Sequence, residues 1–251
     1  MADAIFEEPR LAAIYDAIDD DRSDLEVYAA LVAELGAHVV RDVGCGTGTF
    51  ACMLAAAGKR VIGIDPAAAS LDVARRKPAG GRVRWLEGEA TGLPPAQADL
   101  VTMTGNVAQV FLTDTEWTAV LAATRAALRP EGHLVFEVRD PARCAWQHWT
   151  RAETARRLVI PEVGAVEAWV ELTAVDLPLV SFRHTFVFET DGTTLVSDST
   201  LRFRDKTEIA ESLRDAGFRL REVRDAPDRP GLEFVFIAQR PASPAGSSLE
   251  W

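Results

Sequence analysis

The sequence predicts an α/β protein built on a doubly wound, Rossmann-like sheet of seven strands. Short apolar runs alternate with helix-like segments from about residue 38 to residue 140. Such alternation implies right-handed crossovers between parallel strands, with helices on both faces of the sheet. A glycine-rich turn follows the first apolar run, as in sheets that bind a ligand at the first crossover helix.

The elements follow one another regularly along the first part of the chain. Apolar residues of segment 23–36 lie on one helical face, and Gly36 ends that helix. The patterns after it predict strands at 38–44, 60–65, 82–88, 99–105 and 132–140 and helices at 49–58, 67–77 and 114–130.

After Asp140 the pattern changes to strands alone. Three β-rich runs cover 165–175, 179–190 and 194–204, and an Asp-Gly pair between the last two indicates a hairpin. We therefore expect an antiparallel insertion at about 162–205, before a helix and the last two strands of the main sheet. The whole is predicted to be one domain, 1–240, followed by a flexible tail, 241–251.

Composition excludes several classes of protein. A formal net charge of -11 argues against nucleic-acid binding, which depends on clustered Lys and Arg. The chain has no apolar run of membrane-spanning length and no signal-like start, so we expect a cytoplasmic protein that does not bind membranes. Cys45, Cys52 and Cys144 form no CxxC pair, which predicts reduced thiols, and no residue cluster has metal-ligand spacing.

The turn "DVGCGTG", residues 42–48, is the most informative stretch. Its glycines alternate as GxGxG, which permits unusual dihedrals and close backbone contact with a ligand. The dinucleotide fingerprint GxGxxG requires a third glycine where this chain has Thr49. The spacing therefore disfavours an NAD(P)-dependent oxidoreductase.

Two further strand ends complete a predicted nucleoside pocket. Asp65 ends the second strand, where a carboxylate can accept hydrogen bonds from both hydroxyls of a ribose. Glu89 and Ala90 follow the third strand and can offer a side chain and a backbone N–H to an adenine ring. Asp42 can accept a hydrogen bond from an amine.

Five motifs in this order resemble those of class I S-adenosylmethionine-dependent methyltransferases. They are "VVRDVGCGTGTF", "VIGIDP", "GEATGLP", "DLVTMTGNVAQVF" and "LRPEGHLVFE". The run "LRFRDKTEIAESLRDAGFRLREV" is similar to the C-terminal helix and strand of the small-molecule members. The resemblance covers roughly residues 25 to 140 and 200 to 240, and it implies S-adenosylmethionine as the cofactor, with S-adenosylhomocysteine as product.

The resemblance also implies a set of cofactor-binding residues. The methionine part would contact the glycine turn, the ribose Asp65, the adenine Glu89 and Ala90, and the sulfonium the turn at 104–106. Many members have Asp where this chain has Glu89. The full set is Tyr15, Arg22, Asp42, Gly44, Cys45, Gly46, Gly48, Asp65, Pro66, Glu89, Ala90, Thr104, Gly105 and Asn106.

Candidate catalytic residues are Asn106 after the fourth strand, Glu137 at the end of the fifth and His184 on the inserted hairpin. Each also has a purely structural interpretation, as a turn cap, a solvent-facing strand residue or a packed histidine. Further candidates to contact a substrate are Arg139, Trp146, His148, Trp149 and Arg183.

The function predicted is in-line methyl transfer to a nitrogen or oxygen of a small-molecule acceptor. The neutral leaving group makes alignment more important than acid catalysis, and orientation is worth about 7–11 kcal/mol. A non-catalytic S-adenosylmethionine-binding module is the main alternative, and an NAD(P)-dependent oxidoreductase is a weaker one. The protein would be a monomer or a homodimer, since the inserted strands leave an edge to cover.

Overall fold

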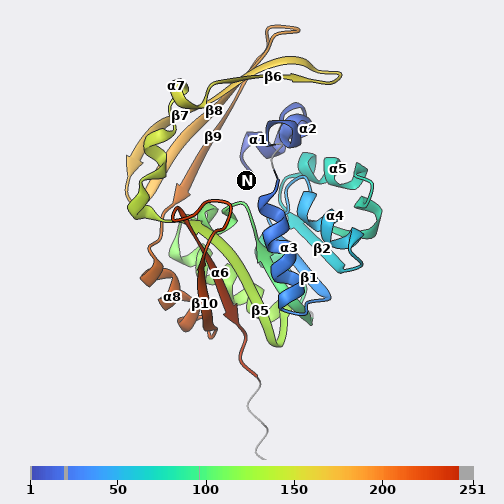
Figure 1. Cartoon of the computed structure of the whole chain (residues 1–251), viewed down its shortest axis with the longest axis vertical. Helices are drawn as coiled ribbons and strands as arrows, with labels where there is room; N and C mark the ends of the chain where they lie inside the picture. The colour runs from blue at the N-terminus through green and yellow to red at the C-terminus, as the bar shows by residue number, and fades with distance from the viewer. Residues whose placement is uncertain (1, 20–21, 96, 243–251) are drawn as a thin grey trace, which may run out of the picture.

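A computed structural model describes residues 2–19, 22–95 and 97–242. Its centre is a seven-stranded sheet of order β10-β11-β5-β4-β1-β2-β3 (Figure 1). Strands β1 to β5 are parallel, whereas β11 runs antiparallel to β5 and β10 antiparallel to β11. The predicted fold class is confirmed. The strands are β1 (Val39–Val43), β2 (Arg60–Asp65), β3 (Arg84–Glu87), β4 (Ala98–Met103), β5 (Leu128–Arg139), β10 (Arg219–Asp225) and β11 (Glu233–Gln239).

Helices cover both faces of this sheet and form two cores. On one face, α3 (Asp24–Glu34) and α4 (Thr49–Ala56) bury Tyr28 and Phe50 against the strands. On the other, α6 (Asp114–Ala127) and α8 (Lys206–Asp215) bury Trp117 and Leu213. The α5 helix (Ala68–Arg76) connects β2 to β3. Apolar side chains therefore lie on both sides of the strands, as a mostly parallel sheet requires.

Local sequence determines where the α6 and α8 helices begin. Thr113 and Asp205 each accept a hydrogen bond from the backbone N–H of the third helical residue, Glu116 or Glu208. The side chain of that residue in turn accepts the backbone N–H of the cap residue. These capping boxes satisfy N–H groups that have no partner within the helix.

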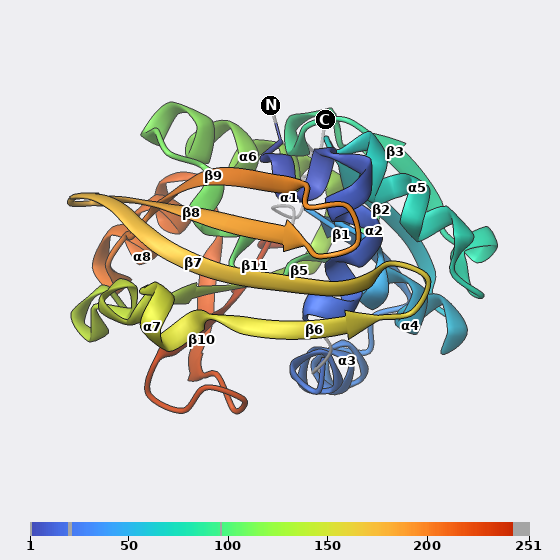
Figure 2. The same ribbon diagram turned by 90° about the horizontal axis from the view of Figure 1, so that it is seen from above.

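A second, four-stranded antiparallel sheet of order β6-β7-β8-β9 lies across the carboxyl ends of β1 to β5 (Figures 1 and 2). Its strands are β6 (Arg156–Ile160), β7 (Gly164–Asp176), β8 (Leu179–Phe188) and β9 (Thr194–Arg202). The predicted boundary at about 162 is wrong, because β6 begins at Arg156. The sequence of β6 does not show the pattern of a strand, because two arginines and an exposed Val159 break its apolar alternation. A short helix, α7 (Arg151–Thr154), precedes it.

The N-terminal segment is helical, which the sequence analysis did not predict. Helices α1 (Ala4–Glu7) and α2 (Pro9–Ile18) lie between the two sheets (Figure 1). They bury Leu11 and Ile14 against Phe186 and Phe188 of β8. The backbone N–H of Ile5 donates to Ser197 Oγ of β9 at 2.9 Å. Tyr15 therefore lies within a helix instead of before the first one.

Of the tail predicted at 241–251, residues 243–251 lie outside the described residues. Residues 241 and 242 are exposed and belong to no helix or strand.

The aromatic stack in the α6 and α8 core predicts a measurable stability contribution. Phe136 is fully buried, lies parallel to Phe236 at 5.3 Å between ring centroids, and meets Trp117 edge-on at 5.5 Å. We expect Phe136→Ala to lower the free energy of unfolding by about 3–5 kcal/mol, because it leaves a cavity in a packed core. Urea denaturation measures this. Leu177→Ala, at a side chain that is 60% exposed, is the control and should change stability by less than about 0.5 kcal/mol.

Candidate active site

The predicted site residues converge at the carboxyl ends of β1, β2, β4 and β5. The strand order reverses direction between β1 and β4, so the loops after these strands diverge and leave a crevice. The N-terminal helices and the second sheet lie over this edge (Figures 1 and 2).

The three glycines of the turn have different surroundings. All adopt left-handed φ values, of 66° at Gly44, 53° at Gly46 and 77° at Gly48. A Cβ on Gly44 would lie 2.5 Å from Val107, and one on Gly48 would lie 2.4 Å from the Trp85 ring, whereas Gly46 has nothing within 4 Å. Gly46 therefore faces open space, while Gly48 is small because a side chain packs behind it.

Asp65 holds the glycine turn to the end of β2. One carboxylate oxygen accepts the backbone N–H of Gly46 and the other that of Ala67, both at 2.8 Å. Burial raises the pKa of Asp65 above its ordinary value, and the two hydrogen bonds offset part of that rise. The Asp65 carboxylate, for which the sequence predicted a ribose contact, therefore lies at the end of β2 beside Gly46.

Asp42 is more deeply buried than its predicted role, accepting a hydrogen bond from an amine of the ligand, requires. Its side chain is 1% exposed and accepts a hydrogen bond from Thr102 Oγ1 at 3.0 Å, so it ties β1 to β4. Burial raises the pKa of Asp42 to about 7. Cys45 is half-buried next to it, and burial raises the pKa of that thiol well above its usual value.

The predicted adenine contacts lie next to Asp65. Glu89 is exposed and precedes a short 3₁₀ turn, η2 (Ala90–Gly92), and its charge contributes to the raised pKa of Asp65. Ala90 is buried, and Pro66 is exposed after β2.

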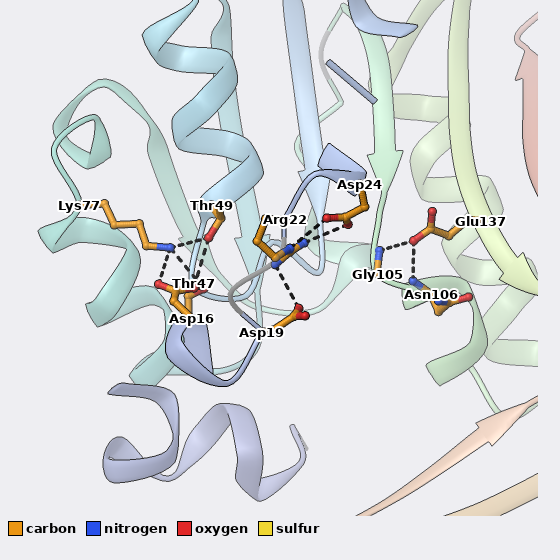
Figure 3. A network of polar contacts seen from close by, with 10 residues as sticks. All are labelled: Asp16, Asp19, Arg22, Asp24, Thr47, Thr49, Lys77, Gly105, Asn106 and Glu137. Carbon is orange, nitrogen blue, oxygen red and sulfur yellow. Dashed lines mark hydrogen bonds and ion pairs between the residues drawn. The ribbon is translucent and has the colours of Figure 1, made fainter. Parts of the chain in front are cut away.

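Glu137 organises the turn after β4. Its Oε1 accepts the backbone N–H of Gly105 at 2.6 Å and that of Asn106 at 3.2 Å, and its Oε2 points away from the turn (Figure 3). Gly105 and Asn106 both have left-handed φ values, of 70° and 61°, and Thr104 precedes them half-buried. Burial, and then the charge of Glu233, raises the pKa of Glu137 to about 7. This carboxyl group therefore exchanges its proton close to neutral pH.

Glu233 is a site residue that the sequence analysis missed. It is 3% exposed, accepts a hydrogen bond from Asn106 Nδ2 at 3.3 Å, and pairs with Arg229 at 2.8 Å and Arg139 at 3.7 Å. Because Glu233 only accepts, it orients the Asn106 amide with Oδ1 on the opposite side, where that buried oxygen has no partner. No local sequence pattern signals this role, because it arises from the register that places Glu233 opposite Arg139.

Arg139 connects this edge to the second sheet. Burial lowers the pKa of its guanidinium, which donates to Gln109 Oε1 at 3.2 Å and lies 5.7 Å from the centroid of the Trp149 ring. Tyr15 of α2 is close enough for its charge state to affect Arg139, and burial raises the pKa of Tyr15 to about 12.

A polar cluster fixes α2 to the glycine turn (Figure 3). Asp16 accepts hydrogen bonds from Thr47 at 2.6 Å and Thr49 at 3.3 Å, and it pairs with Lys77 at 2.7 Å. Just after the C-terminal end of α2, Arg22 pairs with Asp24 at 3.2 Å and with the C-cap residue Asp19 at 3.5 Å.

Some predicted residues lie away from this edge. Arg183 is on the outer face of the second sheet, where it pairs with Asp198 at 2.6 Å. It cannot share the inner face with its neighbour His184, because adjacent residues of a strand point to opposite faces. His148 is exposed and contacts Glu153, and Trp146 is buried against Phe203. His184 lies on the inner face of the second sheet, 5.3 Å from Phe182 between centroids.

Within the described ranges, no three His, Cys, Asp or Glu side chains are grouped so that they could hold a metal ion. None of the helices in the same ranges combines the length and the apolar character needed to cross a membrane.

Sequence comparison identifies related proteins. A family model described as "Methyltransferase domain" matches residues 40–132. A cypemycin N-terminal methyltransferase from Streptomyces sp is 32% identical over 146 residues, which are 55% of this chain. The match spans 58% of that relative's length, so the chain spans little more than half of it.

Solved structures share the fold over almost the whole chain. CalS10, an amino pentose methyltransferase from Micromonospora echinaspora, has a TM-score of 0.70 at 22% identity and covers 90% of this chain and 96% of its own. The sugar N-methyltransferase KedS8 from Streptoalloteichus sp has a TM-score of 0.75 at 17% identity and covers 90% and 92%.

The contrast between Gly46 and Gly48 yields a stability prediction. Alanine at either position must adopt a left-handed φ, which costs about 1–2 kcal/mol. Gly48→Ala should cost a further 1–3 kcal/mol, about what overpacking costs, because its methyl group would meet the Trp85 ring. Chemical denaturation of both variants measures the difference. Equal losses in the two variants would contradict this account of Gly48.

Proposed function

We propose that this chain is a class I S-adenosylmethionine-dependent methyltransferase, as its match to a methyltransferase-domain model supports, and that it transfers a methyl group to a nitrogen or oxygen atom of a small-molecule acceptor. The observation that carries the proposal is that three candidate site residues share one edge of the main sheet. There an open Gly46 backbone after β1, the Asp65 carboxylate at the end of β2 and the Glu137 carboxyl group near the end of β5 lie at the same edge of the sheet.

The residues present fit S-adenosylmethionine. Gly46 leaves room for close approach to the backbone, Asp65 supplies buried carboxylate oxygens for ribose hydroxyls, and Glu89 with Ala90 follows for the adenine. Gly44, Cys45, Thr104 and Gly105 complete the cofactor surface, with Tyr15 and Arg22 from the N-terminal segment over it. When bound, S-adenosylmethionine supplies an electrophilic methyl group on a positively charged sulfur.

Glu137 has the properties of a general base for the acceptor. As the acceptor's lone pair would form the new bond to the methyl carbon, the bond from that carbon to sulfur would break with its electron pair. Glu137 Oε2 would take the N–H or O–H proton that the acceptor loses. A base with a pKa near the working pH is the most effective one, and burial puts that of Glu137 at about 7. Asn106 presents its partnerless Oδ1 from the same turn and orients the acceptor.

The insertion supplies the acceptor-facing wall. The second sheet lies above the edge, and Trp149 and Phe182, 4.6 Å apart between centroids, form an apolar boundary next to Arg139. The negative charge of the chain supports a small acceptor over a nucleic acid. The relative that acts at the N-terminus of cypemycin, by its name, supports a nitrogen acceptor as the first to test.

Cofactor binding tests the role of Asp65. We expect S-adenosylmethionine and S-adenosylhomocysteine to bind with micromolar affinity and NAD not to bind, in isothermal titration calorimetry. Asp65→Ala should lower the affinity for S-adenosylmethionine and S-adenosylhomocysteine by about 10-fold to 100-fold, since charge-assisted hydrogen bonds contribute about 1.5–3 kcal/mol. Asp72→Ala, at an exposed acid on α5 paired with Arg75, is the matched control. Binding of NAD alone would refute the cofactor assignment.

Turnover tests the role of Glu137 and separates an enzyme from a binding module. We expect an acceptor screen of amino sugars and short peptides to release S-adenosylhomocysteine at a rate that rises with pH through about 7, because the base acts when deprotonated. Glu137→Gln should lower kcat by about 100-fold to 10,000-fold with S-adenosylhomocysteine affinity unchanged. A pH-independent rate, or full activity in the variant, would exclude Glu137 as the base.

A further inference from the structure

A cavity of about 440 Å³ lies under the second sheet, beyond the wall formed by Trp149 and Phe182. Its lining includes Ile18 at the end of α2, residues 153–155 and six residues of β6, β7 and β8. These six are Arg156, Ala168, Trp169, Val170, His184 and Phe186.

Strand register explains why a cavity forms here. Arg156 of β6 pairs with Ala168 of β7, which pairs in turn with Phe186 of β8, so the three lie in one row. The small Ala168 at the centre of the row leaves space between two large side chains. Apolar and polar side chains both line this space.

Arg156 brings a positive charge to the cavity, and this charge offsets part of the rise that burial causes in the pKa of the nearby Asp19. Its neighbours Arg151 and Arg157 pair with Glu167 and Glu189, whereas Arg156 forms no ion pair with any residue that the structure describes. The acid on the lining, Glu153, already contacts His148 at 3.1 Å.

His184 adds a neutral hydrogen-bonding group. Burial, and then the charge of Arg156, lowers the pKa of His184 to about 4, so the ring is uncharged at neutral pH. Its Nδ1 is buried without a partner. An N–H there would be an unsatisfied buried donor, so we assign the proton to Nε2, which leaves one donor for a ligand in the cavity.

A series of ring contacts runs from the proposed site of methyl transfer toward the lining of the cavity. Arg139 lies over Trp149, Trp149 contacts Phe182, and Phe182 contacts His184 at 5.3 Å between centroids. An acceptor that reaches both places would lie along these rings, with its reacting atom near Glu137 and its other end near His184.

We propose that this cavity binds a carboxylate group of the acceptor, held by Arg156 and His184, with the acceptor's apolar part against Val170 and Phe186. The proposal rests on the proposed function for the acceptor's identity but not for the binding itself. One guanidinium and one neutral N–H match the two oxygens of a planar monoanion. Glu153 on the lining and the net charge of -11 oppose a dianion such as a phosphate monoester.

Titration calorimetry with benzoate, phenylacetate and hexanoate tests this, with benzamide and phenyl phosphate as comparison ligands, in the presence and absence of S-adenosylhomocysteine. At least one carboxylate should bind the wild type more tightly than both comparison ligands. Arg156→Gln should weaken it at least about tenfold, as expected for a charged hydrogen bond. Arg157→Gln, on the outer face, is the matched control and should leave the affinity unchanged.

The imidazole gives a second readout. In protein labelled with ¹⁵N at histidine, the carboxylate should shift the Nε2 resonance of His184, and His184→Phe should weaken binding without abolishing it. Tighter binding of phenyl phosphate or benzamide, no carboxylate binding, or an unchanged affinity in Arg156→Gln would each overturn the proposal. Carboxylate binding without any binding of S-adenosylhomocysteine would instead retain the cavity assignment and refute the proposed function.

Discussion

The buried carboxyl group of Glu137 is the contact on which the arrangement of the site depends. It comes from β5 and holds both N–H groups of the left-handed turn after β4. That turn places Val107 against Gly44 in the turn after β1 and presents the Asn106 amide to Glu233 of β11. Four strands are thus connected at their ends through one side chain. The backbone hydrogen bonds offset only part of the cost of burial, which leaves its pKa near neutrality.

The site is completed by segments that do not belong to the main sheet. Asp16 connects α2 to Thr47 in the glycine turn and to Lys77 after α5, so an N-terminal helix is tied to the loops on either side of β2. The second sheet then packs on the other side of α2 through Phe186 and Phe188. The N-terminal helices therefore form a middle layer between a cofactor-binding edge and an acceptor-facing wall. Both of these assignments belong to the proposed function.

The parts of this arrangement that sequence could predict are those governed by local patterns. Alternating apolar runs predicted the succession of strands and helices along the chain, and the glycine turn and Asp65 were found because their positions at strand ends follow from the fold. Glu233 was missed because its role arises from pairing with Arg139 across antiparallel strands, which no local pattern encodes. The β6 strand was missed because Arg156 breaks its apolar alternation, and the same residue now lines the cavity. Arg183 and His184 could not be distinguished without knowing which face of β8 is inward.

The hydrogen bond from Ile5 to Ser197 joins residues 192 positions apart. During synthesis the first helices leave the ribosome well before the strands on which they pack. Their apolar residues Leu11 and Ile14 must wait for Phe186 and Phe188 before they are covered. Contacts between such distant segments form slowly, because closing a long loop is entropically costly. The α1 and α2 helices are therefore expected to dock last. The proposed cofactor-binding edge that they cover is then completed only when nearly the whole chain has been made.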